Sequence, residues 1–207
     1  MKYLLSWYGI TDIRAAMGFE YQGPILGALK TGNFDEIHIL AYTKQRVFNE
    51  EEIAAQRNVV NELNNFQGDK SALPREETWK YVDPLANTPV GHQFYVDWLK
   101  KQLWELKITV NIVLHECFLT ELNDTEGIYF SAVKALTAAT TNSNNDITFF
   151  LSPGTPVMAF SWALAMLAFP GVNIKLLASP DFRKGVNLIT IPEKILSHID
   201  FGRGGAK

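Results

Sequence analysis

Short apolar runs alternate with longer segments of helical periodicity along most of this 207-residue chain. Apolar runs of this length are typical of buried strands, and the stripes between them are typical of helices that cover a sheet. Strands that are separated by helices need crossover connections, so the sheet should be mainly parallel. The pattern predicts strands over residues 3–8, 36–42, 108–116, 147–151, 173–178 and 186–191.

The link between the last two strands is too short to hold a helix, so we expect them to pair antiparallel at the edge of the sheet. The fold class that follows is α/β: a Rossmann-like, mainly parallel sheet flanked by helices, with a C-terminal edge hairpin. A helical stripe begins after Gly23 and stops near Thr31. Further helices are expected over residues 49–63, 93–106, 125–140 and 156–168.

The domain organisation predicted from these segments is one domain over residues 1–200, followed by a tail over 201–207. The residues between 66 and 91 contain three prolines and two glycines, which indicates an irregular insertion or a long loop. With the helix that follows it, the added segment covers about residues 66–106.

Composition excludes several classes of protein. A net charge of −3 argues against a general DNA or RNA coat, which needs a broad basic surface. Cys117 is the only cysteine, so a reducing compartment, the cytoplasm, is the natural expectation. The most apolar stretch, residues 157–169, is shorter than the roughly twenty residues that a membrane span needs. We therefore expect neither a membrane nor DNA as a partner of this domain.

In open parallel sheets, ligands bind beyond the carboxyl ends of the strands. The most informative loop at such an end is SPGTP, residues 152–156. Gly154 permits close backbone approach, Ser152 and Thr155 supply hydroxyls, and the free amides of the following helix face the space above. Such a loop can hold a small anion. The alternative is that Thr155 is only an N-cap and Gly154 only part of a tight turn.

The loop after the first strand, GITDIR, offers Gly9 for close approach, the Thr11 hydroxyl, and Arg14 as a partner for a phosphate. The same residues could simply close a turn. Thr43 and Lys44 follow the second strand and could add charge, although a solvated surface is the commoner role. The candidate ligand-binding residues are Gly9, Ile10, Thr11, Asp12, Arg14, Thr43, Lys44, Ser152, Pro153, Gly154, Thr155, Pro156 and Met158.

Motifs of the common catalytic families are missing from the sequence. It contains no GxSxG elbow, Walker loop or HExxH motif, and no GxGxxG follows the first strand, which disfavours NAD and FAD. We therefore expect no cofactor and no metal. Any chemistry would rest on positioning, with Ser152, Thr155 and Lys44 as the candidate catalytic residues.

Two blocks of sequence carry a resemblance to a known family. SWYGITDIRAA, GPILGAL and FDEIHIL in the first block, and ITFFLSPGTPVMAFSWALAML and IKLLAS in the second, resemble the CARF superfamily, the CRISPR-associated Rossmann fold. More narrowly, they look like the branch at the N-terminus of sigma-54 regulators of RNA-repair operons. The likeness covers residues 3–42 and about 108–191.

This resemblance implies a homodimer whose two strand-end faces form one composite pocket. Members of the superfamily sense cyclic oligoadenylates made in antiviral CRISPR responses, and the RNA-repair branch is thought to sense RNA ends. Sensor domains of this kind usually carry an effector on the same chain. By the motif match, the pocket residues would be Gly9, Thr11, Asp12, Ser152, Gly154, Thr155 and Pro156.

Four functions remain open from the sequence. The leading one is a nucleotide-binding sensor of cyclic oligoadenylate that regulates an attached or missing effector. The second is a ring nuclease, which would use the 2′-hydroxyl of its own ligand to cut the adjacent phosphodiester without a metal. The third is a sensor of linear RNA with a modified end that controls RNA repair. The fourth is a dimerisation module without a ligand.

Overall fold

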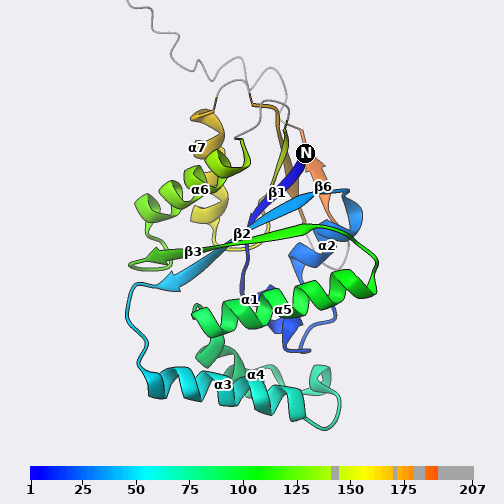
Figure 1. Ribbon diagram of the computed structural model, residues 1–207, viewed down its shortest axis with the longest axis vertical. Helices are drawn as coiled ribbons and strands as arrows, with labels where there is room; N and C mark the ends of the chain where they lie inside the picture. The colour runs from blue at the N-terminus through cyan, green and yellow to red at the C-terminus, as the bar shows by residue number, and fades with distance from the viewer. Residues whose placement is uncertain (141–144, 170–171, 180–184, 191–207) are drawn as a thin grey trace, which may run out of the picture.

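The computed structural model describes residues 1–140, 145–169, 172–179 and 185–190 (Figure 1). Its strands are β1 (Lys2–Trp7), β2 (Glu36–Lys44), β3 (Asn111–Leu119), β4 (Asp146–Phe150), β5 (Ile174–Ala178) and β6 (Asn187–Ile189). Its helices are α1 (Ile10–Ala16), α2 (Pro24–Thr31), α3 (Glu50–Asn65), α4 (Arg75–Leu85), α5 (Pro89–Glu105), α6 (Thr125–Ala139) and α7 (Pro156–Leu167), with a short 3-10 helix η1 (Lys70–Ala72). Within these ranges, every helix is too short or too polar to span a bilayer.

The strands form one sheet in the order β3-β2-β1-β4-β5-β6. All pairings are parallel except that of β5 with β6, which is antiparallel. β1 lies in the middle, where Leu5 pairs with His38 of β2 on one side and with Phe149 of β4 on the other. This arrangement confirms the α/β, Rossmann-like class and the edge hairpin expected from the sequence. Residues 201–207, the predicted tail, lie outside the described residues.

Helices cover both faces of the sheet because the central strands are apolar on both faces. On one face, Leu4 and Ile39 pack against α1, α2 and α5. On the other face, Leu5 and Trp7 pack against α6 and α7. Figure 1 shows these two helical layers on opposite sides of the strands. Each layer buries its own apolar cluster, so the sheet is fixed between two cores.

The helices α3 and α4 lie outside the layer that contains α5 (Figure 1). They pack on each other and on α5, and α4 also packs on α1. The start of α3 is fixed by a reciprocal cap, in which the Glu52 amide donates to Asn49 Oδ1 at 2.8 Å and the Asn49 amide donates to Glu52 Oε2 at 3.0 Å.

The prediction of an irregular loop over residues 66–91 is wrong, because this segment contains η1, α4 and the first turn of α5. The prediction failed because two of these prolines occupy helix positions that tolerate a proline. Pro74 is the N-cap of α4, and Pro89 opens α5. Gly91 reflects close packing, since a Cβ there would lie 1.9 Å from the carbonyl oxygen of Leu85. Glycine at this position therefore marks the contact of α5 with α4.

Two element boundaries also differ from the sequence-based expectation. The GITDIR loop is not a loop, since Gly9 is the N-cap of α1 and the helix begins at Ile10. The third strand begins at Asn111 and not at residue 108, because Lys107 adopts a φ of 58° and the Ile108 amide bonds to the end of α5. It then continues to Leu119, where it pairs with the end of β2.

Candidate functional site

The carboxyl ends of β1 and β4 form the topological switch point of the sheet. The two strands are neighbours, yet the chain leaves β1 into α1 on one face and leaves β4 into α7 on the other. At such a point the two outgoing loops diverge and leave a crevice between them. The sequence of connections therefore predicts a ligand site here, and the structure has a cavity at this place.

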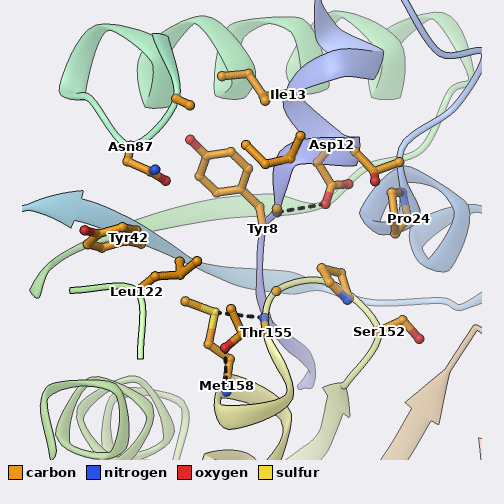
Figure 2. Close-up of a pocket in the computed structure, with 16 residues that line it drawn as sticks. Tyr8, Asp12, Ile13, Pro24, Tyr42, Asn87, Leu122, Ser152, Thr155 and Met158 are labelled. Carbon is orange, nitrogen blue, oxygen red and sulfur yellow. Dashed lines mark hydrogen bonds between the residues drawn. The ribbon is translucent and has the colours of Figure 1, made fainter. Parts of the chain in front are cut away.

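The cavity, called here the switch-point cavity, has a volume of about 350 Å³ (Figure 2). Its walls come from the end of β1 with α1, the end of β2, the α4–α5 loop, the segment after β3, and the β4–α7 loop. The lining residues are Tyr8, Gly9, Ile10, Thr11, Asp12, Ile13, Pro24, Tyr42, Ala86, Asn87, Leu122, Ser152, Pro153, Gly154, Thr155 and Met158.

Asp12 is the buried carboxylate of this cavity and ties α1 to the start of α2. Its Oδ2 accepts from the Gly9 amide at 3.2 Å, and its Oδ1 accepts from the Ile25 amide at 3.0 Å. Burial raises the pKa of Asp12 to about 7, although the two amide hydrogen bonds act in the opposite direction. Among the described residues that line the cavity, none is a lysine or an arginine. The cavity is therefore close to neutral rather than cationic.

The β4–α7 loop forms the opposite wall. Thr155 caps α7, because its Oγ1 accepts from the Met158 amide at 3.3 Å. Gly154 has a φ of +92°, a conformation that side chains rarely adopt. A Cβ there would lie 2.7 Å from Met158 Sδ and 3.3 Å from Trp7 Cβ. Gly154 thus suits the backbone angle, and a side chain there would have to displace the Met158 thioether and crowd Trp7.

The two loops come close together at their glycines. A Cβ on Gly9 would lie 3.2 Å from the backbone nitrogen of Gly154. The N-termini of α1 and α7 consequently face the same cavity, as Figure 2 shows for Asp12 above and Thr155 below. First-turn amides of a helix have no acceptor within the helix, so both ends favour negative charge nearby.

Behind the cavity, Tyr8 belongs to a buried polar chain. Its hydroxyl donates to Nδ1 of His92, whose Nε2 donates to Thr43 Oγ1 at 2.9 Å. Thr43 in turn donates to the carbonyl of Ala41 at 3.4 Å. Burial lowers the pKa of His92 to about 4, so the ring is neutral at pH 7 and can accept at one nitrogen while donating at the other. This chain holds the Tyr8 ring in the cavity wall.

Most of the candidate residues come together at the cavity, and four do not line it. Those in the wall are Gly9, Ile10, Thr11, Asp12, Ser152, Pro153, Gly154, Thr155 and Met158. Pro156 starts α7 next to the wall, and Lys44 is exposed at the end of β2. Thr43 is buried behind the wall, in the chain with His92.

Arg14 is also outside the cavity. It is 6% exposed, its Nη1 donates to Thr78 Oγ1 at 2.6 Å, and its Nε lies 3.4 Å from Glu20 Oε1. The guanidinium therefore joins α1 to α4 and is engaged away from the switch-point cavity. The Ser152 hydroxyl, one of the candidate catalytic groups, is also engaged. It donates to the carbonyl oxygen of Ser179 at 3.1 Å and accepts from the Ser179 amide.

The lining residues that lie outside the GITDIR segment and residues 152–158 were not predicted from the sequence. Tyr8 and Tyr42 are each close to the end of a central strand, which was a usable signal. Asn87 has a positive φ of 60° between α4 and α5, in the segment that was expected to be irregular. Leu122 comes from the connection between β3 and α6. Within the described residues, no group of three or more His, Cys, Asp or Glu side chains is arranged to hold a metal ion.

No protein-family model and no curated protein matches the chain. Solved structures do resemble it, among them Csm6 of Enterococcus italicus bound to cyclic hexa-2′-fluoro-hexa-dAMP. The likeness has a TM-score of 0.56 at 15% sequence identity and covers 96% of this chain. The fold is CARF-like. The chain spans 44% of the length of that Csm6 chain, so the CARF-like unit corresponds to less than half of it.

Proposed function

We propose that the chain is a sensor domain that binds a cyclic oligoadenylate and thereby regulates an effector in CRISPR antiviral defence. The observation that carries the proposal is the meeting of the loops around Gly9 and Gly154 at a switch-point cavity in a CARF-like fold. The similar Csm6 was solved with a cyclic hexanucleotide analogue. The likeness in sequence to the CARF superfamily points in the same direction.

The lining of the cavity suits a nucleotide that is read mainly by neutral groups. Backbone amides at the starts of α1 and α7 favour phosphate oxygens, as helix N-termini do in many nucleotide sites. Tyr42 and Leu122 offer apolar surface on which a base can lie. A ligand whose phosphates are spread round a ring needs less concentrated positive charge than a triphosphate. The absence of lysine and arginine from the described lining residues is therefore compatible with this ligand.

The size of the cavity favours a site shared between two chains. At about 350 Å³ it lies near the lower end of small-molecule sites, which suits part of a ring rather than a whole cyclic oligonucleotide. Two lining residues at the cavity, Ile10 and Leu122, leave 37% and 47% of their surface exposed. A second copy related by a two-fold axis would cover them and present the same wall to the other half of the ring.

The contacts of the three candidate catalytic residues favour binding over cleavage. The Ser152 hydroxyl is engaged with the Ser179 peptide, and the Thr155 oxygen caps α7. Lys44 lies outside the cavity wall. A ring nuclease would need one of these groups free to orient or deprotonate the attacking 2′-hydroxyl.

Isothermal titration calorimetry of the whole chain with cyclic tetra- and hexa-adenylate tests the proposal. We expect one ring bound per two chains, and chromatography of the recovered ligand should show it intact. Gly154→Val should abolish the heat, whereas Gly185→Val, between β5 and β6 and outside the cavity wall, should leave it unchanged. A preference for linear RNA ending in a 2′,3′-cyclic phosphate would contradict the proposal and indicate a sensor for RNA repair.

A further inference from the structure

A second cavity lies between α3 and α5 and shares no lining residue with the switch-point cavity. It has a volume of about 940 Å³, within the range of roughly 300–1,000 Å³ that is usual for small-molecule sites. We call it the α3–α5 cavity and define it by six of its lining residues: Gln56, Arg57, Lys70, Phe94, Trp98 and Lys101.

Gln56 is the group in this cavity that lacks a partner. Its side chain is on α3, it is 5% exposed, and it lines the cavity. Its Oε1 is buried and has no hydrogen-bond partner among the described residues. Native structures rarely leave a buried amide oxygen unpaired, because such an atom has lost its contacts with water. Because the oxygen is closed off from solvent, a ligand donor in the cavity would satisfy it once the Gln56 amide turns toward the cavity.

The charged residues round the cavity favour an anion. Arg57, Lys70 and Lys101 line it, and Asp97 is the one carboxylate among the described lining residues. That carboxylate already accepts from Gln93 Nε2 at 2.8 Å. Lys101 lies 4.0 Å from Glu105 in an exposed ion pair, which is weak and leaves the ammonium available. The switch-point cavity differs, because its described lining residues include the carboxyl of Asp12 but neither lysine nor arginine.

Aromatic rings are the third feature of the α3–α5 cavity that bears on its ligand. Phe94 and Trp98 are half-buried and face it from α5, and Phe48 contributes from the segment before α3. Rings of this kind bind planar ligands by offset stacking or edge contacts. An aromatic surface, a buried acceptor and nearby cations together match a planar base that carries an N–H group and an attached phosphate.

We propose that the α3–α5 cavity is a second ligand site, which takes a nucleoside monophosphate or another planar aromatic anion with a ring donor. The ring packs on Phe94 and Trp98, the Gln56 side chain turns so that its Oε1 accepts from the ring N–H group, and the phosphate lies toward Arg57. The proposal does not depend on the ligand of the switch-point cavity, because the two sites have separate linings.

Calorimetry of the whole chain with adenosine monophosphate tests this site. Gln56→Leu should weaken binding about tenfold, which corresponds to about 1.4 kcal/mol, because the donor on the base would lose its acceptor. The matched control is Gln102→Leu, which changes a glutamine of α5 that hydrogen-bonds Glu105 at 3.1 Å and does not line the cavity. It should bind like the wild type.

Two further comparisons separate the contribution of the aromatic ring to binding from that of the phosphate charge. Adenosine should bind more weakly than the monophosphate, and Arg57→Gln, a change at an exposed position, should remove that difference. Gly154→Val should leave the binding of the monophosphate intact. The proposal is overturned if the monophosphate gives no heat, if Gln56→Leu and Gln102→Leu bind alike, if inorganic phosphate binds as tightly as the monophosphate, or if Gly154→Val abolishes binding.

Discussion

Gly9 and Gly154, which are 145 positions apart in the chain, lie so close at the switch point that a Cβ on Gly9 would come within 3.2 Å of the backbone nitrogen of Gly154. This close approach brings the loop after β1 against the loop after β4. A side chain at Gly9 would crowd the Gly154 backbone, and one at Gly154 would crowd Met158 and Trp7. Both walls of the switch-point cavity therefore have a glycine where they approach each other. A change at either glycine should alter the fold locally and the cavity directly.

Replacing Gly154 with alanine should destabilise the protein more than the same change at Gly185. Both residues have a positive φ, of 92° and 95°, so both variants bear a strain of roughly 1–2 kcal/mol. At Gly154 the new Cβ also meets Met158 and Trp7, whereas at Gly185 it meets no heavy atom of the described residues within 4 Å. Thermal unfolding should show a drop of at least about 2–4 °C for Gly185→Ala and a larger one for Gly154→Ala. Equal drops would mean that the loop tolerates a side chain.

The two stacked tyrosines Tyr8 and Tyr95 should respond oppositely to loss of their hydroxyls. Their rings lie 4.6 Å apart and are nearly parallel. Tyr8→Phe leaves Nδ1 of His92 unpaired and should cost about 1–3 kcal/mol. The Tyr95 hydroxyl has no partner among the described residues, so Tyr95→Phe should be neutral or stabilising. Urea unfolding of the two variants measures the difference, and similar losses would disprove the buried chain through His92.

Asp12 should make the protein less stable as the pH rises. Its pKa is about 7 in the folded chain, whereas an unfolded aspartate ionises near 3.9. Between these values the unfolded state releases a proton that the folded state keeps, so the free energy of unfolding falls from about pH 4 to about pH 7.

Asp12→Asn removes this dependence. Relative to the wild type, the variant should gain on the order of 2 kcal/mol between pH 5 and pH 8, measured by urea unfolding at both values. The control is Asp124→Asn at the N-cap of α6, where hydrogen bonds from the Gly127 and Thr120 amides lower the pKa. That carboxylate is ionised throughout the interval, so its loss should change stability equally at both pH values. An Asp12→Asn variant that keeps the wild-type dependence would show that Asp12 is ionised in the folded chain.

The parts of the site that sequence could predict are those that depend on topology. Carboxyl ends of parallel strands meet at one edge of the sheet, so the GITD and SPGTP loops had to converge if the strands were placed correctly. Arg14 could not be placed in this way, because its partner Thr78 lies on α4. The sequence predicts an irregular segment there on account of its prolines. The hydrogen bond between Tyr8 and His92 could not be predicted either, since His92 lies in the first turn of α5. Contacts between distant helices follow from packing and leave no local pattern.

The most direct test of the sensor proposal is a thermal-shift series on the whole chain. The ligands are cyclic tri-, tetra- and hexa-adenylate, linear oligoadenylate, and RNA that ends in a 2′,3′-cyclic phosphate. A ligand at a hundred times its dissociation constant adds about 2.7 kcal/mol of stability, enough to move the melting curve by several degrees. We predict a shift with one cyclic species that is lost in the double variant Thr155→Ala, Gly154→Val. No shift with any cyclic species would contradict the proposal.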